Sequence, residues 1–152
     1  MSVTISGSGQ IIKQVVQATY STQVSTTSSS FVTTGVSASI TPTNSANKIL
    51  VLINDVLSVH QLSAANFGLG VAIYRNGSSV FTDPNNYDSL YLAPYGNYIG
   101  VDRKRLSIQY LDSPATTSST TYTLYFAAYQ GTAYSCANSA PATITLMEVA
   151  YA

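Results

Sequence analysis

Apolar residues along this chain recur at every second position or form short runs, and none follows a long 3.6-residue helical period. Alternation at every second position is typical of strands, whose successive side chains point to opposite faces. One face of the segment at 31–40 is therefore predicted to carry Val32, Thr34, Val36, Ala38 and Ile40. The segment at 142–152, ATITLMEVAYA, alternates in the same way to the last residue.

Other segments of the same kind predict further strands at 10–20, 48–60, 67–82, 102–114 and 120–131. In the first of these, Ile12, Val16 and Tyr20 are expected on one face. The segment at 48–60 starts with KILVLI, whose consecutive apolar residues predict burial on both faces. Asn76-Gly77 tolerates the positive φ angles of a tight turn and predicts a hairpin.

The spacing of these segments predicts the fold class. Roughly eight or nine strands, with turn signals every ~8–15 residues, favour an all-β antiparallel sandwich or jelly roll. A length of 152 residues corresponds to one domain. We expect residues 1–10, MSVTISGSGQ, to form a flexible N-terminal arm, and residues 11–152 to form a single β-sandwich domain.

Composition changes this interpretation in one respect. Only 8% of the residues are charged, against roughly 25% in an average soluble domain. Six basic residues balance six acidic ones, so neither nucleic acid nor a membrane surface is an expected partner. MSVTISGSGQ at 1–10 lacks a basic region followed by an apolar region, so we expect no signal peptide there. The longest apolar run, ILVLI at 49–53, is too short to cross a membrane. Few charges favour a surface that is covered by other protein.

Candidates for catalysis are few. His60 is the one histidine, and no GxSxG-type elbow accompanies it. Glu148 is expected to point outward, and Asp83, Asp88, Asp102 and Asp112 are expected in turns, so no facing pair of carboxylates is predicted. The one cysteine, Cys136, has no partner for an internal disulfide and is expected to be inert. We therefore predict no enzyme and no catalytic residue.

The stretch DPNNYD offers oxygen ligands for calcium in Asp83, Asn85 and Asp88. A calcium loop of this type also needs a Gly and a bidentate Glu, and Pro94 occupies the position of that Glu. An Asx-Pro turn is the favoured interpretation, and no metal or cofactor is predicted.

The candidate interaction surface combines two features. The stretch TDPNNYDSLYLAPYGNYIG, at 82–100, places Tyr87, Tyr91, Tyr95 and Tyr98 among turn residues. These tyrosines either pack over the end of the sandwich or form a contact surface, for which their flat faces and polar tips are well suited. Arg103 and Arg105 are predicted on one face of a strand with Lys104 opposite. They either keep that strand from pairing at its edge or dock against an acidic neighbour.

Two longer stretches carry a resemblance to a known family. The first is SGSGQIIKQVVQATYSTQVSTTSSSFVTTGVSASITPTNSANKILVLI, and the second runs from LDSPATTSSTTYTLYFAAYQGTA to ATITLMEVA. Together they resemble small β-domains of tailed-phage virion proteins, which are abundant in cyanophages. The resemblance omits residues 60–100. It implies a fold similar to jelly rolls of the C1q and tumour-necrosis-factor type, which typically form trimers, and it brings no catalytic residues.

This resemblance leads to two functional expectations. The first is a virion protein made in the host cytoplasm, a homotrimer that decorates and cements the capsid through contacts with the major capsid protein. The alternative is the receptor-binding tip of a tail fibre, whose tyrosines recognise a host surface glycan or protein. The sequence leaves both open.

Overall fold

A computed structural model describes residues 11–61, 66–93 and 100–150 of the chain. These residues form eleven strands and one short 3₁₀ helix, η1 (Ala137–Ser139). The strands are β1 (Ile12–Tyr20), β2 (Val24–Thr26), β3 (Val32–Ile40), β4 (Lys48–Gln61), β5 (Phe67–Arg75), β6 (Ser78–Thr82), β7 (Leu90–Leu92), β8 (Gly100–Asp112), β9 (Thr120–Tyr129), β10 (Thr132–Ser135) and β11 (Ala142–Val149). Every pair of neighbouring strands is antiparallel.

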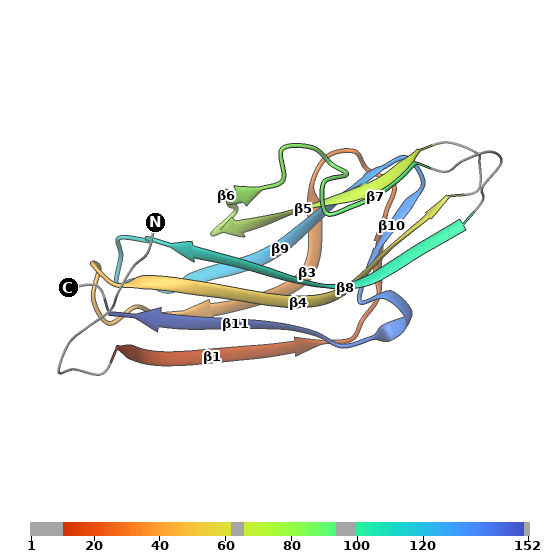
Figure 1. Ribbon diagram of the computed structural model, residues 1–152. Coiled ribbons are helices and arrows are strands. Elements are labelled where there is room, and N and C mark those ends of the chain that lie inside the picture. The colour runs from red at the N-terminus through yellow and green to blue at the C-terminus, as the bar shows by residue number, and fades with distance from the viewer. Residues whose placement is uncertain (1–10, 62–65, 94–99, 151–152) are drawn as a thin grey trace.

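The long strands form two layers that face each other across the core (Figure 1). In sheet A, β4 pairs along one edge with β11 and then β10, and along the other edge with β8; β1 pairs with β11, and β2 pairs with β10. Sheet B has the order β3-β9-β5, and β5 then pairs with β6 and β7. In chain order the eight longer strands alternate between the sheets, as in a jelly roll, except at the β5–β6 hairpin, which lies wholly in sheet B. The predicted fold class is confirmed.

The structure has more strands than predicted. The additional strands β2, β7 and β10 are only three or four residues long, which is too short to show an alternating pattern in the sequence. The predicted hairpin is confirmed at the turn between β5 and β6. Asn76 and Gly77 have φ angles of 48° and 84°, which a two-residue hairpin turn of this kind requires at both positions.

The core lies between the sheets and is filled by one face of each long strand. From β3 it receives the predicted set, with Val36, Ala38 and Ile40 buried. The prediction for β1 is wrong at one residue. A register shift between Ile12 and Gln14 turns Ile12 away, and its side chain is 43% exposed.

Burial of the start of β4 on both faces was also a wrong prediction. Ile49, Val51 and Ile53 point into the core, whereas Leu50 and Leu52 lie half-buried on the outer face. Burial on both faces occurs further along, at 55–59, where β4 contacts the turn that holds η1. The start of β4 lacks such a cover among the described residues.

Candidate functional site

The loop between β6 and β7 lies against β5 of sheet B and carries two of the predicted tyrosines. Its two ends are fixed by Asp83 and Ser89. The backbone N–H of Asp83 donates to the carbonyl of Val71 at 3.0 Å, and the backbone N–H of Val71 donates back to the Asp83 carboxylate at 2.9 Å. The hydroxyl of Ser89 donates to the same carboxylate at 2.5 Å. The backbone N–H of Ser89 donates to the carbonyl of Leu69 at 3.2 Å. The loop is thus a fixed part of sheet B.

Glycines in β5 permit this close approach. A Cβ atom at Gly70 would lie 2.6 Å from the carbonyl oxygen of Asn85, and one at Gly68 would lie 2.7 Å from the Cβ of Tyr87. Both distances are too short for real carbon atoms, so only glycine lets the loop lie on the strand. The amide of Asn86 then donates to the carbonyl of Ala128 in β9 at 3.0 Å.

The result is a tyrosine cluster on the outer face of sheet B, formed by Tyr87, Tyr91 and Tyr129. The ring centroid of Tyr87 lies 5.2 Å from that of Tyr91 and 4.8 Å from that of Tyr129. Tyr91 is 46% exposed. A second pair on the same face, Tyr74 and Tyr125, stacks with centroids 3.9 Å apart.

The structure places two of the predicted tyrosines, and their role as a contact surface stays a prediction. Tyr87 is half-buried against the sheet, and Tyr91 presents its ring to the surroundings. Tyr95 and Tyr98 lie outside the described residues, as does the arm at 1–10. The sequence analysis did not connect Tyr129 to this cluster, because its pairing with Gly68 depends on the register of β5 and β9.

The outer face of sheet A carries an aliphatic row at one end. Strand register places Val15 of β1, Met147 of β11, Leu50 of β4 and Leu111 of β8 side by side across four strands. Val15 and Leu111, at the two ends of the row, are 52% and 51% exposed. We call these four residues the aliphatic row.

At the other end of this face, β8 carries the predicted arginine pair. Arg103 lies opposite Ser58 and Arg105 opposite Val56 of β4, so the two share the outer face as expected. Arg103 donates to the Asn138 side chain at 3.2 Å and Arg105 to the Pro141 carbonyl at 3.1 Å. Both guanidinium groups therefore reach across β4 to the turn at 136–141.

His60 has a serine neighbour that the sequence analysis missed. Its Nε2 lies 3.0 Å from the hydroxyl oxygen of Ser58, since alternate residues of a strand share a face. The Ser58 hydroxyl donates to the carbonyl of Asp102 at 2.8 Å, so its proton is not directed at the imidazole. Burial and the nearby charge of Arg103 both lower the pKa of His60. This arrangement does not activate Ser58 as a nucleophile.

Glu148 does not point outward, contrary to the prediction. It shares the inner face of β11 with Ile144 and Leu146 and is fully buried. Its carboxylate accepts hydrogen bonds from Gln14 at 2.7 Å, from the backbone and hydroxyl of Thr43 at 2.7 and 2.8 Å, and from Asn47 at 2.6 Å. Burial alone would raise the pKa of Glu148, but these hydrogen bonds lower it to about 2. The residue fastens the loop after β3 to sheet A.

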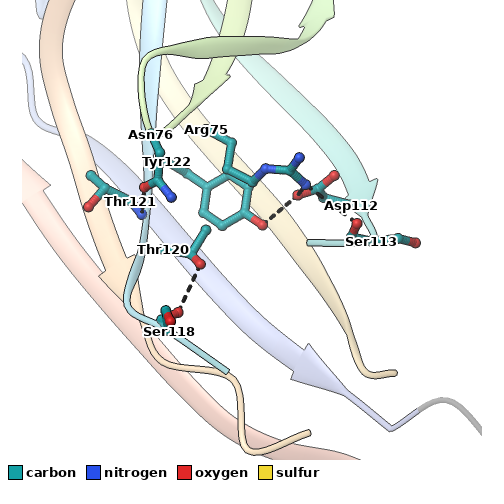
Figure 2. Close-up of polar contacts among 8 residues, drawn as sticks. All are labelled: Arg75, Asn76, Asp112, Ser113, Ser118, Thr120, Thr121 and Tyr122. Carbon is teal, nitrogen blue, oxygen red and sulfur yellow. Dashed lines mark hydrogen bonds and ion pairs between the residues drawn. The ribbon is translucent and has the colours of Figure 1, made fainter. Parts of the chain in front are cut away.

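Asp102 and Asp112 both lie in β8 and not in turns, contrary to the prediction. Asp112 links the two sheets (Figure 2). Its carboxylate accepts a 2.6 Å hydrogen bond from the hydroxyl of Tyr122 in β9 and forms a 2.8 Å ion pair with Arg75 of β5. Burial is the main cause that raises the pKa of Tyr122, and the hydrogen bond to Asp112 raises it further. A tyrosine held in its neutral form by these contacts is a structural group.

Two further features bear on chemistry. Within the described residues, no group of three or more His, Cys, Asp or Glu side chains could hold a metal ion, and no helix is long and apolar enough to cross a membrane. An open groove of about 270 Å³ lies between β4 and β8. It is lined by Leu52, Ile53, Asn54, Ser107, Ile108 and Gln109. None of these side chains can act as a general acid or base near neutral pH.

No protein-family profile and no curated protein sequence matches this chain. Solved structures give partial matches. One is infectious bursal disease virus, Gt strain, with 15% identity over 99% of this chain and 42% of that chain, at a TM-score of 0.45. Another is the VP2 subviral particle of infectious bursal disease virus, with 17% identity over 90% of this chain and 37% of that chain, at 0.41.

A third match is dimeric latent PorU from Porphyromonas gingivalis, with 10% identity over 95% of this chain and 14% of that chain, at a TM-score of 0.46. The chain spans about two fifths or less of the length of these proteins. Because the TM-scores lie below 0.5, these likenesses assign no function to the chain. The jelly roll itself is defined by the strand order above and hosts unrelated functions.

Proposed function

We propose that this chain is a structural protein of a virus particle, a homotrimer that decorates the capsid and cements it through the outer face of sheet A. The observation that carries this proposal is the exposure of the aliphatic row. The start of β4 has apolar residues for both faces, yet the described residues bury only its inner face. Exposed aliphatic side chains on a sheet face are typical of a protein contact site.

Two further observations support this function. The chain has few charges, and a sparsely charged surface suits a protein that is packed against others. The aliphatic row also lies within the two stretches that resemble tailed-phage virion proteins, which contain Val15, Leu50, Leu111 and Met147. Burying aliphatic area yields about 25 cal/mol per Å², and a contact repeated over many copies on a capsid sums to a large stabilisation.

The test compares two double variants on the same two strands. Val15→Ser with Leu111→Ser removes the ends of the row, and Gln17→Ser with Gln109→Ser changes exposed polar residues next to it. We expect the first variant to bind the capsid about tenfold or more weakly, because each side chain loses ~1 kcal/mol of burial, and to remain a trimer in sedimentation equilibrium. The control should assemble normally. A wild-type chain that is monomeric at micromolar concentration, or an unaffected serine variant, contradicts the proposal.

Copy number in purified virions separates this function from the alternative. Quantitative mass spectrometry against the major capsid protein should give hundreds of copies per particle for a decoration protein. A handful of copies would place the chain at a fibre or tail tip.

The second candidate is a receptor-binding tip, and the tyrosine cluster favours it. Tyr87, Tyr91 and Tyr129 lie on sheet B, on the side away from the aliphatic row, so both faces can be used at once. Aromatic rings held by a fixed loop suit the binding of a host surface glycan or protein. Tyr87→Ala with Tyr91→Ala should abolish cell binding and preserve folding if this function holds. Loss of assembly instead would assign the tyrosines to subunit contacts.

A further inference from the structure

The balanced charge of the sequence hides an unbalanced surface. Six acidic and six basic residues give a net charge of zero, and all twelve lie in the described residues. Of the six acidic residues, Asp55, Asp112 and Glu148 are buried, and only Asp88 is exposed. Four of the bases are exposed: Lys13, Arg103, Lys104 and Arg105. The surface is therefore basic, although the chain is neutral.

The basic side chains are concentrated on β8. Lys104 points away from the outer face of sheet A and pairs with Asp102 at 3.1 Å. Arg103 and Arg105 point to the outer face and donate only to neutral oxygens, at Asn138 and Pro141. No carboxylate among the described residues lies on this face. The two positive charges are thus fixed in place and are not neutralised by the chain itself.

Apolar and aromatic side chains flank the arginines. Val101, 49% exposed, precedes them on β8, and His60 lies opposite it on β4. The ring of His60 lies 4.3 Å from that of Tyr134 in β10, which neighbours Ser58 and so adjoins Arg103. Arginine and tyrosine beside an exposed aliphatic residue form the composition of a protein contact site.

We propose that Arg103 and Arg105 form a docking site for an acidic surface of a partner protein. The inference rests on the proposed function and names the chemistry of the capsid surface that sheet A would meet, with carboxylates opposite the arginines and apolar residues opposite the aliphatic row. The Cα atoms of the two arginines lie about 7 Å apart along the strand, and each guanidinium group has donors left for a carboxylate. Two cations among apolar groups are too few for a nucleic acid, whose binding needs many phosphate contacts.

The test uses three probes and three variants. An oligo-glutamate peptide, heparin and a DNA duplex are titrated against the whole protein at low ionic strength. Arg103→Gln with Arg105→Gln should weaken peptide binding about tenfold, and Arg103→Lys with Arg105→Lys should retain most of it, because the charge persists. Lys104→Gln, on the opposite face, is the matched control and should bind normally. Circular dichroism confirms that each variant is folded.

The same variants are then added to capsids that lack the chain. Loss of capsid binding by the glutamine variant, with normal binding by Lys104→Gln, supports the docking site. Normal capsid binding by the glutamine variant, with loss by the Val15 and Leu111 variant, overturns this inference and preserves the proposed function. Absence of the wild-type chain from virions overturns the proposed function, and the peptide titration then decides on the site alone. Tighter binding to DNA or heparin than to the peptide, abolished by the glutamine variant, overturns the choice of a protein partner.

Discussion

Replacement of Glu148 by glutamine gives the sharpest test of how this fold is held together. The buried carboxylate accepts four hydrogen bonds, three of them on one oxygen. Glutamine keeps one acceptor oxygen but turns the other into an NH₂ donor. That donor would face the amide of Gln14, which itself donates to the carboxylate and to the carbonyl of Thr41. The variant therefore loses the charge and places two donors against each other.

The magnitude follows from the pKa of this group. In the folded chain the pKa of Glu148 is about 2, against an ordinary value of 4.5. Since one unit corresponds to about 1.4 kcal/mol, the ionised carboxylate stabilises the fold by about 3 kcal/mol. A depressed pKa means that this contribution is complete above pH 4.5 and is lost as the pH falls toward 2. We expect Glu148→Gln to cost about 3 kcal/mol near neutral pH and little at pH 2.

Urea unfolding between pH 2 and pH 7, followed by circular dichroism, measures this difference directly. Asp88→Asn removes an exposed carboxylate and serves as the control, with an expected change below about 0.5 kcal/mol. Wild-type and Glu148→Gln curves that run parallel over the whole pH range would refute the reasoning. So would a variant as stable as the wild type at pH 7.

Three further predictions concern other buried contacts. Tyr122→Phe should lower the free energy of unfolding by about 1.5–3 kcal/mol in the same urea assay, because it removes a buried hydrogen bond to the Asp112 carboxylate; an unchanged midpoint would exclude that role. Gly70→Ala should lower the free energy of unfolding by about 1–3 kcal/mol and displace the loop that carries Tyr87, because the added Cβ would lie 2.6 Å from the carbonyl oxygen of Asn85. Amide hydrogen exchange in that loop should accelerate, and normal protection would count against the contact. Cys136, 1% exposed and with its pKa raised by burial, should react with a thiol reagent only after unfolding, and rapid labelling of the native chain would contradict its placement.

The local pattern was sufficient for the eight longer strands and for the hairpin at Asn76-Gly77, but not for the short strands β2, β7 and β10. Both depend on neighbouring residues, since alternation and positive φ are properties of a short segment. The prediction for Ile12 was wrong because one register shift reverses the faces of a strand. The pattern also predicted burial for the outer residues of KILVLI, which the described chain leaves half-buried, and this disagreement is the basis of the proposed contact face.

The candidate surface could be predicted only in part. The sequence marked Tyr87, Tyr91, Arg103 and Arg105 through their residue types and flanking turns. It did not indicate Tyr129, which reaches the tyrosine cluster through strand pairing.

By itself, the sequence determined the all-β class and most strand positions, because the period of apolar residues is a local property. Tertiary structure decided which charges reach the surface. Glu148 is buried because donors from two distant segments meet at its carboxylate, whereas Arg103 and Arg105 stay exposed on an edge strand. A count of charges assigns them no position, and only the folded chain shows that a neutral sequence presents a basic face.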